Sequence, residues 1–347
     1  SNLKRVTSLS QQCSKEMLET LQSSLETLTM TKSFNDRNLE VTIQVPDSTT
    51  RAPCNVVLVI DESASMGSEA IMKNDSGQNE SHGFSLLDIV KQAAHAVRVC
   101  LEDHDSLAVV AYSANGRVVL PFTPMTSTGK LTAESAINQI KPTSNTNIWD
   151  GLVKAFDLCR TNSSPEKNSK ILLLTDGMPN VIPPRGHVGM INKYKDTHGQ
   201  LPATVDTFGF GYSLDTKDLG NIALESLGNY CFIPDSSMVG DIFSNAVANI
   251  LSMAISNSQL SIALPDGIQF NENAIMGNHS YQNTSWGISL DTGPMYYGQK
   301  KTYIFNFNSN LTPEILNGTD VNIRYQHFDK ETNTIATNID FDQNHNM

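Results

Sequence analysis

Between residues 55 and 255 the sequence alternates short apolar runs with longer segments of helical periodicity, which restricts the fold more than any other feature. The apolar runs are NVVLVI (55–60), SLAVVAYS (106–113), RVVLPF (117–122), KILLLTD (170–176), TVDTFGF (204–210) and YCFIP (230–234). Helical patterns lie between them at 85–102, 129–140, 148–160, 216–227 and 237–254. Near-continuous apolar strands that alternate with helices are typical of a mostly parallel sheet covered on both faces. We therefore expect an α/β fold with a doubly wound sheet.

One strand of this sheet is expected to run the other way. The run at 117–122 follows the run at 106–113 after only a short polar turn, Ala114-Asn115-Gly116. Such a short connection allows only an antiparallel hairpin, because a parallel crossover needs a dozen residues or more. We place 117–122 at an edge of the sheet.

The two flanks of the α/β segment have different patterns. Residues 7–31 carry leucines at helical spacing, and residues 39–45 alternate apolar and polar side chains as a half-buried strand does. After residue 257 only short strand patterns remain, separated by Gly, Pro and Asn. We expect both flanks to pair into one small β-sandwich-like domain with the α/β domain inserted between them. The expected divisions are 1–35 as a helical segment, 36–51 as a strand of the β domain, 52–256 as the α/β domain and 257–347 as the β-sandwich-like domain.

Charge and hydropathy exclude several classes of function. The formal net charge of −12 disfavours nucleic acid, which needs a positive surface to displace counterions. No apolar run reaches the length that spans a membrane. The five cysteines are widely spaced and include no C-x-x-C, so we expect buried free thiols and favour a cytoplasmic, intracellular location, with delivery into a host cell as a compatible alternative.

Polar oxygen-bearing residues stand where central strands are expected to end. Asp61, Ser63 and Ser65 follow the first strand in the stretch VVLVIDESASMG, and Asp176 follows the strand in LLLTDGMP. Thr146 lies in a third polar loop, PTSNTNIWDGL, just before the helix at 148–160. Ligands of open α/β sheets collect at the carboxyl ends of the strands, so these loops are expected to meet at one rim. Two carboxylates and three hydroxyls are hard ligands that suit Mg²⁺ or Ca²⁺, and the absence of His and Cys argues against zinc.

A simpler explanation exists for part of this pattern. Asp and Ser after a strand often only cap the following helix. Helix capping accounts for one serine but not for oxygen ligands in three separate loops, so we favour metal binding.

Two segments beside the rim are expected to be loops. The polar stretch GSEAIMKNDSGQNESHG precedes the helix at 85, and residues 177–196 follow Asp176 with Pro183-Pro184 and a locally basic composition. Either segment is expected to influence partner choice or simply to be solvated.

The set of five positions resembles the metal-ion-dependent adhesion site of von Willebrand factor type A domains, whose pattern is D-x-S-x-S with a distant Thr and a distant Asp. Asp61, Ser63, Ser65, Thr146 and Asp176 match all five positions, and the resemblance covers roughly 52–256. The stretches ESHGFSLLDIVKQAAH, LLLTDGMPNVIPPRGH and DTFGFGYSLD resemble more closely the A domains of eukaryotic proteins in which this domain accompanies Hint or U-box modules.

The resemblance implies a fold, a cofactor and a function. By the family's geometry, the Ser63 and Ser65 hydroxyls bind Mg²⁺ directly, as does the Thr146 hydroxyl in the open form of the site, with Mn²⁺ or Ca²⁺ as alternative ions. Asp61 and Asp176 act largely through water or from just outside the metal's direct ligands. The implied function is a protein-binding module whose cation captures an Asp or Glu of a partner protein, within a larger and ubiquitin-linked or effector protein. Two alternatives remain: a metal-assisted hydrolase and a structural module with a vestigial site. We expect no enzyme activity, because no G-x-S-x-G elbow or activating histidine accompanies Ser63 or Ser65.

Overall fold

The structure is a computed structural model that describes residues 28–47, 51, 53–73, 79–162, 167–211, 214–234, 238–255, 258–277, 279, 281–326 and 332–336. The chain divides into two compact units. One unit comprises Pro53–Leu251, and the other combines Ser1–Ala52 with Ser252–Met347. Each unit is described by itself below.

The Pro53–Leu251 unit is built on a six-stranded sheet in the order β10-β9-β8-β3-β6-β7. Its strands are β3 (Cys54–Asp61), β6 (Ser106–Tyr112), β7 (Gly116–Pro124), β8 (Asn168–Thr175), β9 (Thr204–Phe210) and β10 (Tyr230–Ile233). All neighbouring pairs are parallel except β6 and β7, which are antiparallel. The predicted α/β class, doubly wound sheet and antiparallel edge strand are confirmed.

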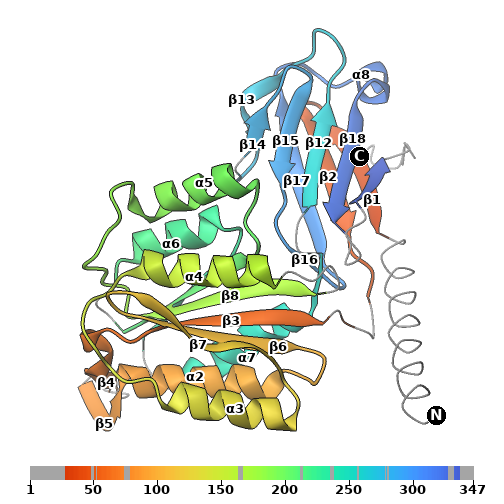
Figure 1. Ribbon diagram of the computed structural model, residues 1–347. Coiled ribbons are helices and arrows are strands. Elements are labelled where there is room, and N and C mark those ends of the chain that lie inside the picture. Colours follow the sequence, from red (N-terminus) through yellow and green to blue (C-terminus); the bar gives the residue numbers. More distant parts are fainter. Residues whose placement is uncertain are drawn as a thin grey trace, which may run out of the picture. The chain divides into compact units, whose positions relative to one another are not determined.

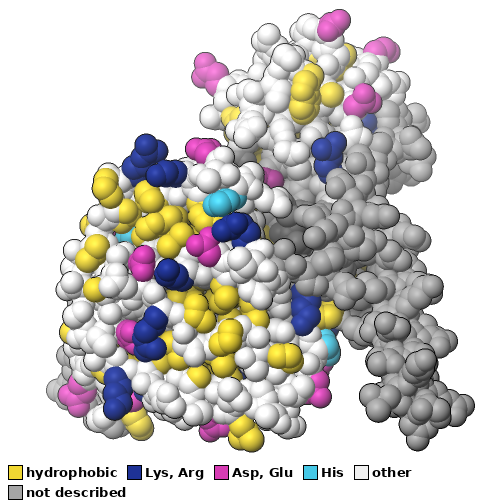
Figure 2. Space-filling view, viewed as in Figure 1, with side chains coloured by type: hydrophobic (Ala, Val, Ile, Leu, Met, Phe, Trp, Pro, Cys, Tyr) yellow, Lys and Arg dark blue, Asp and Glu magenta, His cyan; other side chains and the backbone are white. Residues whose placement is uncertain are grey.

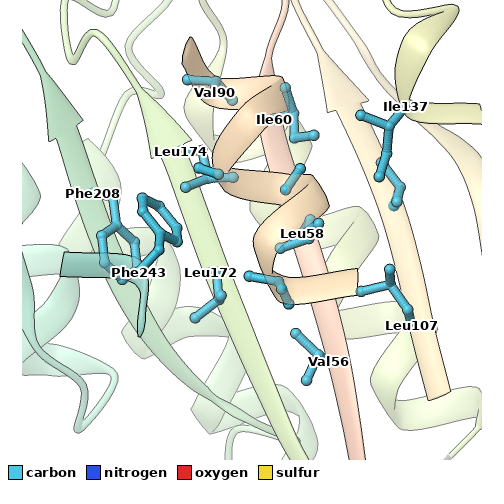
Figure 3. Close-up of a cluster of buried hydrophobic side chains, with 14 of the residues drawn as sticks. Val56, Leu58, Ile60, Val90, Leu107, Ile137, Leu172, Leu174, Phe208 and Phe243 are labelled. Atoms are coloured by element: carbon cyan, nitrogen blue, oxygen red, sulfur yellow. The ribbon is translucent and has the colours of Figure 1, made fainter. Parts of the chain in front are cut away.

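Helices cover both faces of this sheet (Figure 1). They are α2 (Leu86–Cys100), α3 (Ser127–Asn138), α4 (Ile148–Thr161), α5 (Gly186–His198), α6 (Thr216–Glu225) and α7 (Val239–Leu251). Alternate residues of β3 enter two different cores: Val56, Leu58 and Ile60 pack with α2, α3 and α7, whereas Val57 and Val59 pack with α4, α5 and α6. Figure 3 shows the first core, with Leu58 and Ile60 beside the helix that carries Val90. Burial on both faces explains why this strand is apolar throughout.

The strand order creates a switch point beside the first strand. The chain proceeds from β3 to β6 on one side, and β8 later pairs with the other side of β3. The connection after β3 contains α2 and the connection after β8 contains α5, and these helices pack on opposite faces of the sheet. Open α/β sheets bind their ligands at the carboxyl ends of the strands beside such a switch point. Asp61 ends β3 and Asp176 follows β8, so the two carboxylates flank this switch point.

Two segments expected to be loops are partly regular. The stretch after the first strand contains a short 3-10 helix, η1 (Ala64–Gly67), and a hairpin of β4 (Glu69–Lys73) and β5 (Asn79–Ser85). The segment after Asp176 is irregular only as far as Arg185, since α5 begins at Gly186. Its apolar spacing was missed because only Ile191, Tyr194 and His187 are buried on a helix that is otherwise polar.

The second unit consists of antiparallel sheets. One has the order β1-β2-β17-β13 and another the order β14-β15-β12-β18-β19, while β11 and β16 form a two-stranded pair. The strands are β1 (Thr29–Asn35), β2 (Asn38–Gln44), β11 (Met253–Ile255), β12 (Ser258–Ala263), β13 (Phe270–Ile275), β14 (Tyr281–Asn283), β15 (Gly287–Asp291), β16 (Met295–Tyr296), β17 (Lys300–Phe307), β18 (Asp320–Gln326) and β19 (Thr332–Ala336), with a short helix α8 (Pro313–Asn317). Residues of both larger sheets, including Val41, Phe305, Leu260 and Ile323, share one buried cluster. We interpret the packing of these two sheets as sandwich-like.

The flanks of the α/β unit meet in the first of these sheets, where β2 lies between β1 and β17. The expected helical segment 1–35 is wrong at its end, because Thr29–Asn35 form strand β1. Paired with β2, residues 29–33 alternate exposed and half-buried side chains, which is strand periodicity. Residues 1–27 of that prediction lie outside the described residues.

Candidate metal centre

Asp61 is the buried anchor of the candidate site. Its Oδ1 accepts a 2.8 Å hydrogen bond from the backbone amide of Ser63, which folds the chain back just after β3. Its Oδ2 accepts bonds from the Thr175 hydroxyl at 2.6 Å and from the Tyr112 hydroxyl at 3.2 Å. Asp61 is thereby tied to its own loop and to the ends of both neighbouring strands, β6 and β8.

The two serines of the loop present their hydroxyls to each other. Ser63 Oγ and Ser65 Oγ lie 3.1 Å apart, with Ser63 buried and Ser65 exposed. Ser63 caps η1 by position but makes no side-chain capping bond. The capping explanation therefore does not account for the Ser63 hydroxyl, which faces Ser65 instead.

Asp176 carries an unpartnered oxygen at the same rim. Its Oδ1 is buried and has no hydrogen-bond partner among the described residues. Burial raises the pKa of Asp176, while interactions with the Ser65 hydroxyl and the Met178 amide oppose that rise. A buried acceptor without a hydrogen-bond partner costs free energy. A cation, or a water molecule bound to a cation, would satisfy this oxygen.

The electrostatics of the two carboxylates favour a bound cation. Burial raises the pKa of Asp61 to about 6, the negative charge of Asp176 adds to the rise, and hydrogen bonds from Ser63 and Thr175 oppose it. Among the described residues, no Lys or Arg forms an ion pair with Asp61 or Asp176. Two buried acids close enough to repel each other are stabilised when a positive charge lies between them.

Thr146 reaches the rim through backbone contacts. Its amide donates a 2.9 Å hydrogen bond to Asn180 Oδ1, and its carbonyl accepts bonds from the amides of Asn180 and Val181. Just upstream, the Ser144 carbonyl accepts a bond from the Ala64 amide, so the Thr146 loop also contacts the serine loop. Thr146 itself is buried.

All five predicted residues thus lie on three loops that contact one another. Hydrogen bonds or charge interactions link Asp61, Ser63, Ser65 and Asp176 directly, whereas Thr146 is brought in by its backbone. Within the described part of the chain, no group of three or more His, Cys, Asp or Glu side chains forms a metal site. The candidate is the hydroxyl-rich set itself, whose donors are the hard oxygens that Mg²⁺ takes.

Sequence reasoning missed the residues that support this set. Thr175 and Tyr112 hold Asp61, and Asn180 holds Thr146. Thr175 and Tyr112 had a usable signal, since each is a polar residue at the end of an apolar strand. Asn180 had none, because its partner lies in a loop distant in sequence.

An ion pair between Glu62 and Arg117 also holds the serine loop. Arg117 on β7 donates to both carboxylate oxygens of Glu62, from Nε at 3.1 Å and from Nη2 at 2.7 Å. The Glu62 side chain is only 4% exposed, while that of Arg117 is 52% exposed. Glu62 is therefore occupied by Arg117, and its buried charge is compensated without a metal.

Comparison with known families identifies the α/β unit. The family model described as "von Willebrand factor type A domain" matches residues 56–178, which include Asp61, Ser63, Ser65, Thr146 and Asp176. A solved structure described as von Willebrand factor type A from Catenulispora acidiphila is similar with a TM-score of 0.65 and 18% identity, covering 88% of this chain and 70% of that chain. At this identity the similarity shows the fold alone. Residues 56–178 of the α/β unit thus match the von Willebrand factor type A family model, in agreement with the resemblance found in the sequence.

Curated relatives are more distant and longer. The chain is 21% identical over 231 residues to "Probable E3 ubiquitin-protein ligase WAVH2" of Arabidopsis thaliana, covering 65% of this chain and 30% of that protein. It is 28% identical over 224 residues to "Inter-alpha-trypsin inhibitor heavy chain H4" of Bos taurus, covering 60% of this chain and 22% of that protein. The chain spans less than half the length of these relatives. Domains of this type commonly mediate protein interactions.

Among the helices that the structure describes, none combines the length and apolar character that a bilayer crossing requires.

Proposed function

We propose that the chain is a metal-dependent protein-binding module in which a Mg²⁺ ion at the rim captures an acidic side chain of a partner protein. Ser63, Ser65 and Thr146 would supply hydroxyl ligands, and Asp61 and Asp176 would orient them and balance the charge largely through water. Mn²⁺ or Ca²⁺ are alternative ions. The bound cation would supply an electrophilic position that a carboxylate can occupy.

The single observation that carries the proposal is the 3.1 Å separation of Ser63 Oγ and Ser65 Oγ. Adjacent ligands of an octahedral Mg²⁺ lie at about 2.0–2.1 Å from the ion and hence about 2.9 Å from each other. The two hydroxyls therefore already have nearly the spacing of two adjacent ligands. Ca²⁺, with bonds of about 2.3–2.6 Å but six to eight ligands set at smaller angles, accepts the same spacing, so this distance is compatible with either ion.

The unpartnered Asp176 Oδ1 supports the same assignment. Hydroxyl ligands are neutral, and the two carboxylates are already engaged by Ser63, Thr175 and Ser65. A divalent ion held this way retains positive charge toward solvent at the exposed Ser65. A partner's Asp or Glu can replace one bound water and supply the missing negative charge.

The contacts of the serines and Asp61 favour binding over hydrolysis. Among the described residues, no histidine side chain bonds to Ser63 or Ser65. The carboxyl that contacts the Ser65 hydroxyl is Asp176, which we assign to the metal rather than to the activation of a nucleophile. A carboxyl with a pKa of about 6 would suit a general base, but Asp61 is fully buried and both its oxygens already accept hydrogen bonds. We propose a non-catalytic domain of a larger protein. The similarity to a protein named as a probable E3 ubiquitin ligase makes a ubiquitin-linked setting our preferred context.

Titration calorimetry with Mg²⁺ and Mn²⁺ tests the metal site. We expect binding to the unaltered chain, none to Asp176→Asn and much weaker binding to Ser65→Ala. The matched control is Ser68→Ala, which removes an exposed hydroxyl three residues away and should leave binding unchanged. Absence of binding to the unaltered chain, with all variants folded by circular dichroism, would reject the site.

Affinity capture in Mg²⁺ and in chelator tests the binding function. A partner identified in this way should be retained in Mg²⁺, lost in chelator and lost with Asp176→Asn. Retention that is unchanged in all three conditions would assign partner binding to another surface and leave the metal site vestigial.

A further inference from the structure

The loop between β8 and α5 exposes two large apolar side chains beside the candidate metal site. Met178 is 55% exposed and Ile182 is 63% exposed. Single exposed apolar residues are common on protein surfaces and need no explanation. Two such residues on one short loop, directly after the carboxylate of Asp176, form a defined apolar surface if the loop backbone holds them in place.

The first half of the loop is fixed by Gly177. Its amide donates a 2.9 Å bond to the Thr175 hydroxyl, and its carbonyl accepts a 3.1 Å bond from the Asp215 amide. Gly177 has φ +69°, and an added Cβ would lie 2.8 Å from Leu214 Cδ2. Only glycine adopts this backbone conformation without strain. The backbone just before Met178 is therefore fixed by hydrogen bonds at both the amide and the carbonyl of Gly177.

The second half is fixed by Asn180 and by a turn. Asn180 and Val181 make three hydrogen bonds to the backbone of Thr146. The Gly186 amide then donates a 2.8 Å bond to the Pro183 carbonyl, and Pro183-Pro184 restrict the backbone further. Ile182 thus lies between the Thr146 contact and a closed turn. Both apolar side chains are displayed by a pinned loop.

The surroundings favour a negatively charged occupant. Arg185, the last residue of this loop, and Lys193, two turns into α5, are exposed in a protein whose formal net charge is −12. Figure 2 shows hydrophobic side chains on the face that carries α4 and α5, interspersed with Lys and Arg and also with Asp and Glu side chains. The loop is apolar, with Arg185 at one end and the candidate cation site at the other. Such a surface is complementary to a peptide segment that combines negative charge with an apolar side chain.

We propose that Met178 and Ile182 form an apolar subsite of the metal-dependent site, so that the partner is a peptide segment with a large aliphatic residue close to its acidic ligand. The inference rests on the proposed function, since the acidic residue is held by the cation. The acid supplies dependence on metal, and the aliphatic side chain, packed on Met178 and Ile182, supplies selectivity among acidic segments. Burying such a side chain raises affinity by about 10-fold or more.

The test is selection from a random linear peptide library displayed on phage, with binding in Mg²⁺ and elution by chelator. Three baits are compared with the unaltered chain: the double substitution Met178→Ser/Ile182→Ser, Asp176→Asn, and the control Leu131→Ser. Leu131 is 67% exposed on α3 and has no part in the proposed site, so its substitution controls for loss of exposed apolar surface. Mg²⁺ affinity of each bait is measured by calorimetry.

We expect the unaltered chain and Leu131→Ser to enrich peptides in which Asp or Glu neighbours Leu, Ile, Val or Met. Met178→Ser/Ile182→Ser should keep its Mg²⁺ affinity and still enrich acidic peptides, without the aliphatic neighbour, and should bind the original peptides about 10-fold more weakly. Asp176→Asn should enrich neither.

Two results would overturn the proposal, and they are distinguishable. Acidic peptides enriched without an aliphatic neighbour, or an unchanged peptide pool with the double substitution, would reject the apolar subsite and leave the metal-dependent function intact. Chelator-eluted pools with no acidic enrichment for the unaltered chain would reject the proposed function and the subsite with it.

Discussion

The amide of Thr146 donates a 2.9 Å hydrogen bond to Asn180 Oδ1, which joins the loop before α4 to the loop after β8. The side chain of Asn180 touches the proposed metal ligand only through this backbone bond. Asn180 is therefore a positioning residue for Thr146, comparable to the outer groups that orient metal ligands elsewhere.

Replacing Asn180 by Ala should weaken Mg²⁺ binding by about 10-fold, the lower end of the usual effect of such supporting residues. Because Asn180 is exposed, the free energy of unfolding should change little. Calorimetry and urea unfolding measure the two effects. Equal Mg²⁺ affinity in Asn180→Ala would show that the Thr146 loop holds its position without Asn180, or that Thr146 is not a ligand.

The ion pair between Glu62 and Arg117 should stabilise the serine loop. Removing Arg117 by substitution with Ala leaves the buried Glu62 carboxylate without its partner, and we expect the free energy of unfolding to fall by about 2–4 kcal/mol. Urea unfolding of Arg117→Ala, Glu62→Gln and the double variant gives the coupling energy. A coupling energy near zero would contradict this prediction and would mean that solvent around the half-exposed guanidinium screens its attraction to the Glu62 carboxylate.

Much of the α/β unit was predictable because its strands are buried on both faces. The apolar run from Val56 to Ile60 has one structural interpretation, and the sequence range 204–210 predicted for β9 is the observed one. Strand ends also located Asp61 and Asp176, since parallel strands place their carboxyl ends together.

The predictions from sequence were wrong or incomplete where the local hydrophobic pattern was weak or where the contacting residues were far apart in sequence. The leucine-rich pattern that ends at Leu28 was extended into Thr29–Asn35, yet pairing with β2 makes this segment a strand. Helix α5 was missed because few of its side chains are buried. Tyr112 could be recognised as a polar residue at the end of an apolar strand, but its bond to Asp61, far away in sequence, could not be predicted. The contact of Asn180 at the site is likewise remote in sequence, and no local signal encodes it.

The cysteines should differ sharply in reactivity. Burial raises the pKa of the Cys159 thiol to about 12, so almost no thiolate is present at pH 8, whereas Cys100 is exposed. Iodoacetamide at pH 8 should modify Cys100 and spare Cys159 in the folded chain, as measured by peptide mass spectrometry. Both should react after unfolding in urea. Comparable labelling of the two before unfolding would contradict the burial of Cys159.

Lys301 should make the stability of the β unit depend on pH. Its ammonium group donates to the carbonyls of Thr292 and Pro294, yet burial lowers its pKa to about 8 from the ordinary 10.5. Between these values the unfolded chain holds a proton that the folded chain has released, so the free energy of unfolding rises with pH. We expect a rise on the order of 1 kcal/mol after allowance for solvent screening.

The control for Lys301 is Lys301→Met, in which this titration is absent while all other groups are unchanged. Urea unfolding at pH 7.5 and pH 10 gives the free energy of unfolding of the unaltered chain and of Lys301→Met. From the lower to the higher pH, this free energy should rise more for the unaltered chain than for Lys301→Met. A difference that stays constant would show that Lys301 titrates normally.

The most direct measurement is anomalous diffraction from crystals of the chain soaked in Mn²⁺. The account predicts one strong peak at the carboxyl ends of β3 and β8, within about 2.0–2.4 Å of the hydroxyl oxygens of Ser63, Ser65 and Thr146. A soaked crystal with no manganese at that rim, or with manganese bound by side chains elsewhere, would contradict it.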